Sequence, residues 1–173
     1  MDHGTADHAA MDHGAMGGMS TDPDPDVRFM QDMIPHHAQA LEMAALVEGR
    51  SAGRAVTLVA ERIRVSQADE IRRMSRWLTA RGKAVPASHT GHLMAGMLTP
   101  EQMAALASAT GPEFDRLFLT GMIQHHRGAL VMVDQILDAP GGAQASDVYQ
   151  LVSDIEADQT AEISRMQSLL TQP

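Results

Sequence analysis

The sequence predicts an all-α protein, a four-helix bundle built from two tandem helical hairpins. Ala, Leu, Met, Glu, Gln and Arg are plentiful, whereas aromatic residues make up only 3% of the 173 residues. This composition favours helices. No stretch alternates between apolar and polar residues as a half-buried strand would. Apolar residues recur instead at helical spacing, and the whole hairpin pattern occurs twice.

The repeat is visible in two segments, "MIPHHAQALEMA" at residues 33–44 and "MIQHHRGALVMV" at residues 122–133. Their matching positions are 89 residues apart. A second pair of matching segments begins at Ile63 and Ile155, 92 residues apart, which fits a longer loop in the second hairpin. Two hairpins that pack their apolar faces together form a four-helix bundle.

The bundle is expected over residues 27–171, with repeat 1 at about 27–82, a long crossover at 83–111 and repeat 2 at about 112–171. The predicted long helices are residues 27–48, 55–81, 112–137 and 147–170. Gly82 is a candidate C-cap residue. Within the crossover, "TPEQ" at residues 99–102 predicts a short helix to about residue 109. Its Thr serves as N-cap, its Pro takes the first helical position and its Gln closes a capping box.

Residues 1–26 form a low-complexity tail of Asp, His, Gly, Met and Ala. Its apolar surface is too small to offset the entropy lost on ordering, so we expect disorder. The tail contains His3, His8 and His13, which are candidate metal ligands. The alternative is a solvated leader.

Composition excludes several classes of function. A formal net charge of −9 argues against nucleic acid as a partner. Without cysteine there is no disulfide, thiolate zinc site or cysteine nucleophile. No apolar run approaches the roughly 20 residues that span a bilayer. The first 26 residues contain no apolar export-signal segment, so the chain is either cytosolic or a mature protein whose signal has been removed.

Histidine and methionine share one helix face in each repeat. In the first repeat the face contains Met33, His36 and Met43, at steps of three, four or seven residues. The second repeat has the same face, made of Met122, His125 and Met132. The alternative is a hydrogen-bonded core histidine with methionine as an ordinary apolar filler.

The histidines occur as adjacent pairs, His36 with His37 and His125 with His126. Neighbouring residues on a helix diverge by about 100°. One imidazole of each pair is therefore expected to face the bundle centre and the other a flank, which predicts more than one metal position. Imidazole and thioether ligands suit copper, as Cu(I) or Cu(II). Zinc fits less well because methionine is not one of its usual protein ligands.

Two further groups are candidates. The crossover contains His89, His92, Met94 and Met97, which form a second predicted metal-binding group or an ordinary loop. The second and fourth long helices place polar residues on or beside their apolar stripes. These residues form either a layer that hydrogen-bonds the imidazoles or solvated edge positions: Gln67, Glu70, Gln159 and Glu162.

The doubled segments "DMIPHHAQALEMA" and "GMIQHHRGALVMV", with "GMLTPEQMAAL" and "EFDRLFLTGMIQHH", resemble domain-of-unknown-function family 305 over about residues 26–171. The resemblance implies a ferritin-like four-helix bundle, export, often as a lipoprotein, and copper binding of the kind some members use in copper resistance. Gly121 stands where a second methionine is common, so the two half-sites are expected to differ. The lipid-carrying cysteine of many members is absent. The family's histidine pairs and flanking methionines fall on Met33, His36, His37, Met122, His125 and His126.

These observations favour an extracytoplasmic copper-binding protein that sequesters or carries copper and is not an enzyme. It is expected to be periplasmic, secreted or lipid-anchored, and to be a monomer or homodimer that exchanges metal with another copper-handling protein. One alternative is a ferritin-like di-metal oxidase, which needs Glu-x-x-His on two helices. Met33 and Met122 occupy those glutamate positions, so the motif is absent. The other alternative is a metal-free bundle whose histidines sense pH.

Overall fold

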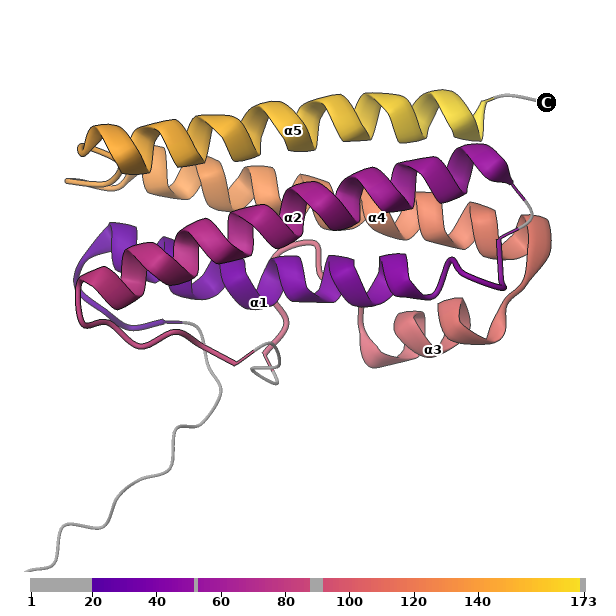
Figure 1. Ribbon diagram of the computed structural model, residues 1–173, viewed down its shortest axis with the longest axis horizontal. Coiled ribbons are helices and arrows are strands. Elements are labelled where there is room, and N and C mark those ends of the chain that lie inside the picture. Colours follow the sequence, from indigo (N-terminus) through magenta and orange to yellow (C-terminus); the bar gives the residue numbers. More distant parts are fainter. Residues whose placement is uncertain (1–19, 52, 88–91, 172–173) are drawn as a thin grey trace, which may run out of the picture.

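The computed structural model describes residues 20–51, 53–87 and 92–171, and it confirms an all-α bundle (Figure 1). Four long helices lie side by side, and the part of the chain that is described contains no strand. The short helix α3 belongs to the connection between the two hairpins. The helices are α1 (Pro25–Ala45), α2 (Arg54–Ala80), α3 (Pro100–Ser108), α4 (Gly111–Asp138) and α5 (Ser146–Leu170).

The long helices pack as two hairpins laid against each other. Helix α1 packs on α2, and α4 packs on α5. Contacts of α1 with α4 and of α2 with α5 then join the two hairpins. Helices α1 and α4, which hold the histidine pairs, run in opposite directions (Figure 1). A residue before the histidines of one helix therefore lies at the same end of the bundle as a residue after the histidines of the other.

Local signals set the start of α3 and the end of α2 as predicted. The Thr99 side chain accepts a hydrogen bond from the backbone of Gln102, and the Gln102 side chain accepts one from the backbone of Thr99, so the capping box is present. Gly82 has a φ of 65° just after α2. This left-handed conformation lets the Lys83 N–H reach the Leu78 carbonyl at 3.0 Å, which closes the helix end.

Order begins before residue 26, so the expected boundary of the disordered tail is wrong for residues 20–26. Ser20 N–H donates to Asp32 at 2.7 Å, and Asp22 forms an ion pair with Lys83 at 2.8 Å. Asp24 caps α1 by accepting from the Asp26 N–H. Composition did not reveal these partners because they lie on α1 and on the segment after α2. The rest of the tail, including His3, His8 and His13, lies outside the described residues.

A polar layer divides the core into two apolar halves. One apolar cluster surrounds Met33 and Met132 near the start of α1, and the other surrounds Met43 and Met122 near its end. Between them the four histidines are completely buried. The glutamines and glutamates predicted for α2 and α5 are also buried, with at most 3% of their surface exposed. The layer comprises His36, His37, His125, His126, Gln67, Glu70, Gln159 and Glu162.

The crossover is held against α4 by two glycines. A Cβ atom on Gly128 would lie 1.9 Å from the Ala95 carbonyl oxygen, and one on Gly96 would lie 2.7 Å from the Gly128 Cα. Gly96 also has a φ of 75°, which disfavours other residues. Backbone contact at this point brings the Ala95 carbonyl to the bundle interior, where it meets the histidine layer.

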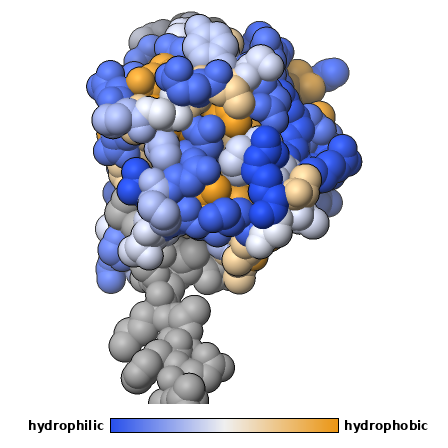
Figure 2. All heavy atoms as spheres, turned by 90° about the vertical axis from the view of Figure 1, so that its left-hand side faces the viewer, coloured by the Kyte–Doolittle hydropathy of each residue, from blue (hydrophilic) through white to orange (hydrophobic). Residues whose placement is uncertain are grey.

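The surface gives no sign of a membrane span. Within the described ranges, none of the helices combines the length and apolar character needed to cross a bilayer. Figure 2 shows that the end of the bundle where α1 and α5 begin is largely hydrophilic, with only scattered apolar residues.

Gly128→Ala should destabilise the fold, whereas the same change in an open helix usually stabilises it by about 0.5–1 kcal/mol. Because the new methyl group would collide with the Ala95 carbonyl, we expect a loss of about 1–3 kcal/mol in urea unfolding. Val131→Ala, at an exposed position on the same helix, serves as the control. Equal stability of the two variants would show that the crossover does not depend on this contact.

Candidate metal centre

The inner histidines, His36 of α1 and His125 of α4, face each other at the centre of the bundle. Their ring centroids are 3.9 Å apart, with an angle of 39° between the ring planes. Both are completely buried. Sequence spacing predicted one inward imidazole in each pair, and the structure confirms that geometry and shows that it is the first histidine of each pair.

Backbone carbonyls fix the protonation pattern of the inner histidines. The His36 Nε2 lies 3.0 Å from the Ala95 carbonyl oxygen, and the His125 Nε2 lies 2.9 Å from the His36 carbonyl oxygen. A carbonyl oxygen only accepts, so each Nε2 must carry the hydrogen and donate it. In the neutral imidazole the lone pair is then on Nδ1.

Burial keeps the inner histidines neutral. It lowers the pKa of His36 to about 3, with the neighbouring His37 as a further cause. Burial also lowers the pKa of His125 well below its usual range, again assisted by the neighbouring histidines. At neutral pH both Nδ1 atoms therefore offer a lone pair, which is the form that binds a metal.

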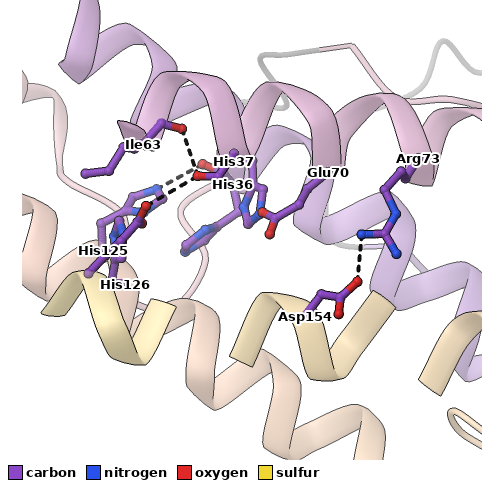
Figure 3. Close-up of polar contacts among 10 residues, drawn as sticks. His36, His37, Ile63, Glu70, Arg73, His125, His126 and Asp154 are labelled. Atoms are coloured by element: carbon purple, nitrogen blue, oxygen red, sulfur yellow. Dashed lines mark hydrogen bonds and ion pairs between the residues drawn. The ribbon is translucent and has the colours of Figure 1, made fainter. Parts of the chain in front are cut away.

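The outer histidines, His37 and His126, turn towards the neighbouring helices. The His37 Nε2 lies 2.6 Å from a carboxylate oxygen of Glu70 on α2, and the His126 Nε2 lies 2.7 Å from one of Glu162 on α5. Because the carboxylate accepts, each Nε2 donates. Figure 3 shows the two pairs and their neighbours. The predicted hydrogen-bonding layer is thus confirmed for the glutamates, and the solvated-edge alternative is wrong because these helix faces meet inside the bundle.

All four Nδ1 atoms are buried and have no hydrogen-bond partner in the protein. Leaving a buried polar atom unpaired costs about 1–3 kcal/mol. A ligand that binds these nitrogens would remove that cost. Metal coordination through Nδ1 would satisfy them while Nε2 keeps its present partner. Over the described ranges, no three His, Asp or Glu side chains form a ready-made metal cage. Any site here must therefore use fewer imidazoles, supplemented by thioethers, or adjust on binding.

The glutamines of the layer are buried but do not bind the imidazoles. Neither amide atom of Gln67 has a partner, and the Oε1 of Gln159 also lacks one. Glu162 differs from Glu70 in one contact, because its second oxygen accepts from the Ser66 hydroxyl at 3.3 Å. The second oxygen of Glu70 has no partner. The two halves of the layer are therefore similar but not equivalent.

The antiparallel helices bring the predicted methionines together in two groups, one on each side of the histidine layer. Met33 joins Met132 in one apolar cluster, and Met43 joins Met122 in the other. All four are at least nine-tenths buried. Gly121 borders the second group. A Cβ there would lie 3.4 Å from the Met43 methyl group, an ordinary contact, and 3.1 Å from a Leu98 methyl group, a tight one.

The crossover adds a buried methionine to one group only, because Met103, which packs against the cluster of Met43 and Met122, is only partly buried. Met94 is buried in the same cluster as Met33, and Met97 packs against that cluster from outside. Met94 and Met132 line one cavity of about 550 Å³, together with Asp32. His92, two residues before Met94 in the sequence, is exposed, whereas Met94 is buried. His89 lies outside the described residues.

Sequence reasoning missed the two backbone acceptors, because a carbonyl oxygen has no sequence signature of its own. The nearest signal for Ala95 was the pair Gly96 and Gly128, whose close approach was not deduced. Sequence also gave no indication that Ser66 would reach Glu162.

Residues 26–170 match the family described as "Domain of unknown function (DUF305)". The chain belongs to the DUF305 family. A crystallised DUF305 fragment from Deinococcus radiodurans is 35% identical, covers 86% of this chain and 96% of its own, and superposes with a TM-score of 0.75. A DUF305 protein of Streptomyces coelicolor, thought to be secreted, is 28% identical over 85% of this chain and 92% of its own, with a TM-score of 0.76.

The DUF305 chain is also similar to CopM, whose solved structures include a Cu(I)-bound and a Cu(II)-bound form. The Cu(I)-bound form is 29% identical, covers 83% of this chain and 94% of its own, and has a TM-score of 0.68. The Cu(II)-bound form is 28% identical with the same coverage and a TM-score of 0.70. No curated protein sequence matches this chain.

The metal-free protein should lose stability as the pH falls below about 6.5. In the unfolded chain His36 takes a proton near its ordinary pKa of 6.5, whereas in the folded protein it stays neutral to about pH 3. The free energy of unfolding is therefore not reduced by this titration above pH 6.5. Between pH 6.5 and pH 3 it falls by about 1.4 kcal/mol per pH unit.

Urea unfolding at pH 7 and pH 5 tests this effect. The decrease in the free energy of unfolding between pH 7 and pH 5 should be about 2 kcal/mol smaller in His36→Gln than in the original chain, since the variant lacks this titration. The same pH dependence in both proteins would contradict the assignment of a neutral, buried His36.

Proposed function

We propose that this protein binds copper at the buried histidine layer and sequesters or carries it outside the cytoplasm. The observation that carries the proposal is the set of four buried Nδ1 atoms without partners, two of them on rings 3.9 Å apart. No other buried group in the described residues concentrates so many unpaired nitrogens.

The chemistry of the surrounding side chains favours copper over harder metals. Thioether sulfurs lie on both sides of the layer, and thioether with imidazole is a donor set that selects Cu(I), with Cu(II) accommodated by the imidazoles. Calcium and magnesium prefer cages of oxygen ligands. The layer has only two carboxylates, and one oxygen of each already accepts a hydrogen bond from a histidine. Zinc would use the imidazoles but not the methionines.

The relatives support this assignment. CopM has been solved with Cu(I), Cu(II) and silver, a soft ion that resembles Cu(I) in its ligand preference. The description of the Streptomyces coelicolor relative supports a location outside the cytoplasm. We further propose that the metal is cargo passed to another copper-handling protein rather than a centre of turnover.

The two alternative functions fit the layer less well. A di-metal oxidase uses carboxylates from all four helices, whereas α1 and α4 have methionines at the corresponding positions. A pH sensor needs histidines that titrate near neutrality. Burial instead lowers the pKa of His36 to about 3, outside that range.

The first test is Cu(I) binding measured by competition with a chromophoric chelator under anaerobic conditions. A variant with His36, His37, His125 and His126 all changed to Gln should lose the bundle's share of bound copper. Loss of the hydrogen-bond partner of a ligand already costs about 10- to 100-fold in metal affinity, so loss of the ligands themselves should weaken copper binding by the bundle at least about 100-fold. Unchanged stoichiometry and affinity would refute the proposed site and leave only the tail and crossover.

A control variant with His3, His8 and His13 changed to Gln separates tail binding from bundle binding. It should keep the copper bound by the layer. Circular dichroism of both variants checks that the helices remain folded.

The second test concerns the thioethers. Met33→Leu and Met122→Leu nearly conserve volume, so the loss of stability should stay below about 1.5 kcal/mol. Cu(I) affinity should fall because a soft ligand is removed, whereas Cu(II) affinity should change little. Met166→Leu, which is equally buried in the cluster that contains Met122, is the matched control. If all three variants bind Cu(I) alike, the methionines serve only as core residues.

A further inference from the structure

A polar cavity between α2 and α5 reaches the buried layer from the surface. It has a volume of about 220 Å³ and is lined by Ser66, Asp69, Glu70, Arg73, Asp154, Ala157 and Asp158. We refer to it as the acidic vestibule. Both long helices contribute carboxylates to its walls, and it opens on the flank of the bundle rather than at an end.

The floor of the vestibule is the histidine layer itself. Glu70 lines the cavity, yet only 3% of its surface is exposed. One of its oxygens accepts from His37, and the other is buried without a partner. Ser66, another lining residue, donates to Glu162, which in turn accepts from His126. The cavity therefore connects to His37 through Glu70, and to His126 through Ser66 and Glu162.

The outer part of the vestibule is negative and partly closed. Arg73 and Asp154 form an ion pair across it at 2.8 Å, and both side chains are 37% exposed. In Figure 3, Glu70 lies between His37 on one side and this ion pair on the other. Burial raises the pKa of Asp158, and the nearby carboxylates of Glu70 and Glu162 raise it further, although Arg62 opposes them. Several carboxylates therefore lie close together at this point.

Two larger cavities also approach the layer, because both are lined by Ala95, whose carbonyl accepts from His36. They differ from the vestibule in charge. The lining of one contains Arg127 as its charged residue, and the other places Arg28 beside Asp32, so neither has an excess of carboxylates.

Four carboxylates and one guanidinium line the vestibule. Arg72 pairs with Asp69 at 2.7 Å and Arg62 lies near Asp158, so carboxylates still outnumber the cations and attract a positive ion. Because three of the four carboxylates already have a partner in the protein, the vestibule is suited to passing a cation rather than to holding one.

We propose that the acidic vestibule is the route by which metal cations reach the histidine layer, with the Arg73–Asp154 ion pair as its outer gate. A cation drawn in by Asp158 would meet the free oxygen of Glu70, which is one hydrogen bond away from His37. This inference rests on the proposed function, because it assumes that the layer is the destination.

Stopped-flow absorbance tests the route, using the full chain and Cu(I) supplied as its cationic acetonitrile complex without oxygen. The bundle phase is defined as the phase that disappears in His36→Gln/His125→Gln. Asp158→Asn should slow its association rate about 3- to 10-fold at low ionic strength, since a steering charge is lost. Glu156→Gln removes the same charge from an exposed position on the same helix and should have little effect.

Arg73→Gln gives the opposite prediction, because it opens the gate and leaves the floor intact. Association and dissociation should both become faster by a similar factor of about 3 or more, with little change in equilibrium affinity. Arg64→Gln, which breaks an exposed ion pair with Glu61 on the same helix, is its control.

The outcomes separate the two proposals. If the original chain shows no bundle phase, both the copper site and the route are refuted. If the phase is present but Asp158→Asn behaves like Glu156→Gln and Arg73→Gln behaves like Arg64→Gln, the route alone is refuted. Slower association in Asp158→Asn, together with faster exchange in Arg73→Gln, supports it.

Discussion

The hydrogen bonds made by the Nε2 atoms of four buried histidines organise the centre of this protein. Each Nε2 donates to an oxygen that only accepts, a backbone carbonyl for the inner pair and a glutamate carboxylate for the outer pair. These contacts tie α1 to α2, to α4 and to the crossover, and α4 to α5. They also leave every Nδ1 atom without a partner. The interaction that orders the bundle therefore also leaves four nitrogen atoms that can bind a ligand.

A layer of this kind is a costly way to fill a core. Apolar side chains of similar volume would avoid the penalty of buried, unpaired polar atoms. The apolar clusters on either side account for the stability of the fold, and the layer separates them. Such a departure from an apolar core is expected where function requires it. Binding of a soft metal by Nδ1 and the neighbouring thioethers would remove the penalty, and would link metal loading to stability.

The internal repeat explains why the layer is nearly symmetric, and the crossover explains why it is not fully so. The crossover passes one side of the bundle only, where Gly96 and Gly128 allow backbone contact. There the Ala95 carbonyl binds His36, whereas His125 has to use a carbonyl of α1. The crossover also supplies a buried methionine, Met94, on one side of the layer, whereas Met103 on the other side is only partly buried. The two half-sites therefore start from the same sequence motif and end in different surroundings.

The amino-acid sequence alone predicts the helices, the caps at Thr99 and Gly82, the two hairpins and the residues of the polar layer. It could do so because helical periodicity, capping boxes and repeats are local patterns. It also required that His36 and His37 point in different directions, since a helix separates neighbours by about 100°. The packing of the helices and the crossover places His36 opposite His125, Glu70 and Glu162 beside the outer pair, and the Ala95 carbonyl at His36. The two residues of each contact are separated by between 33 and 89 positions in the sequence. Which long-range partners meet depends on how the helices and the crossover pack, and no local pattern specifies that.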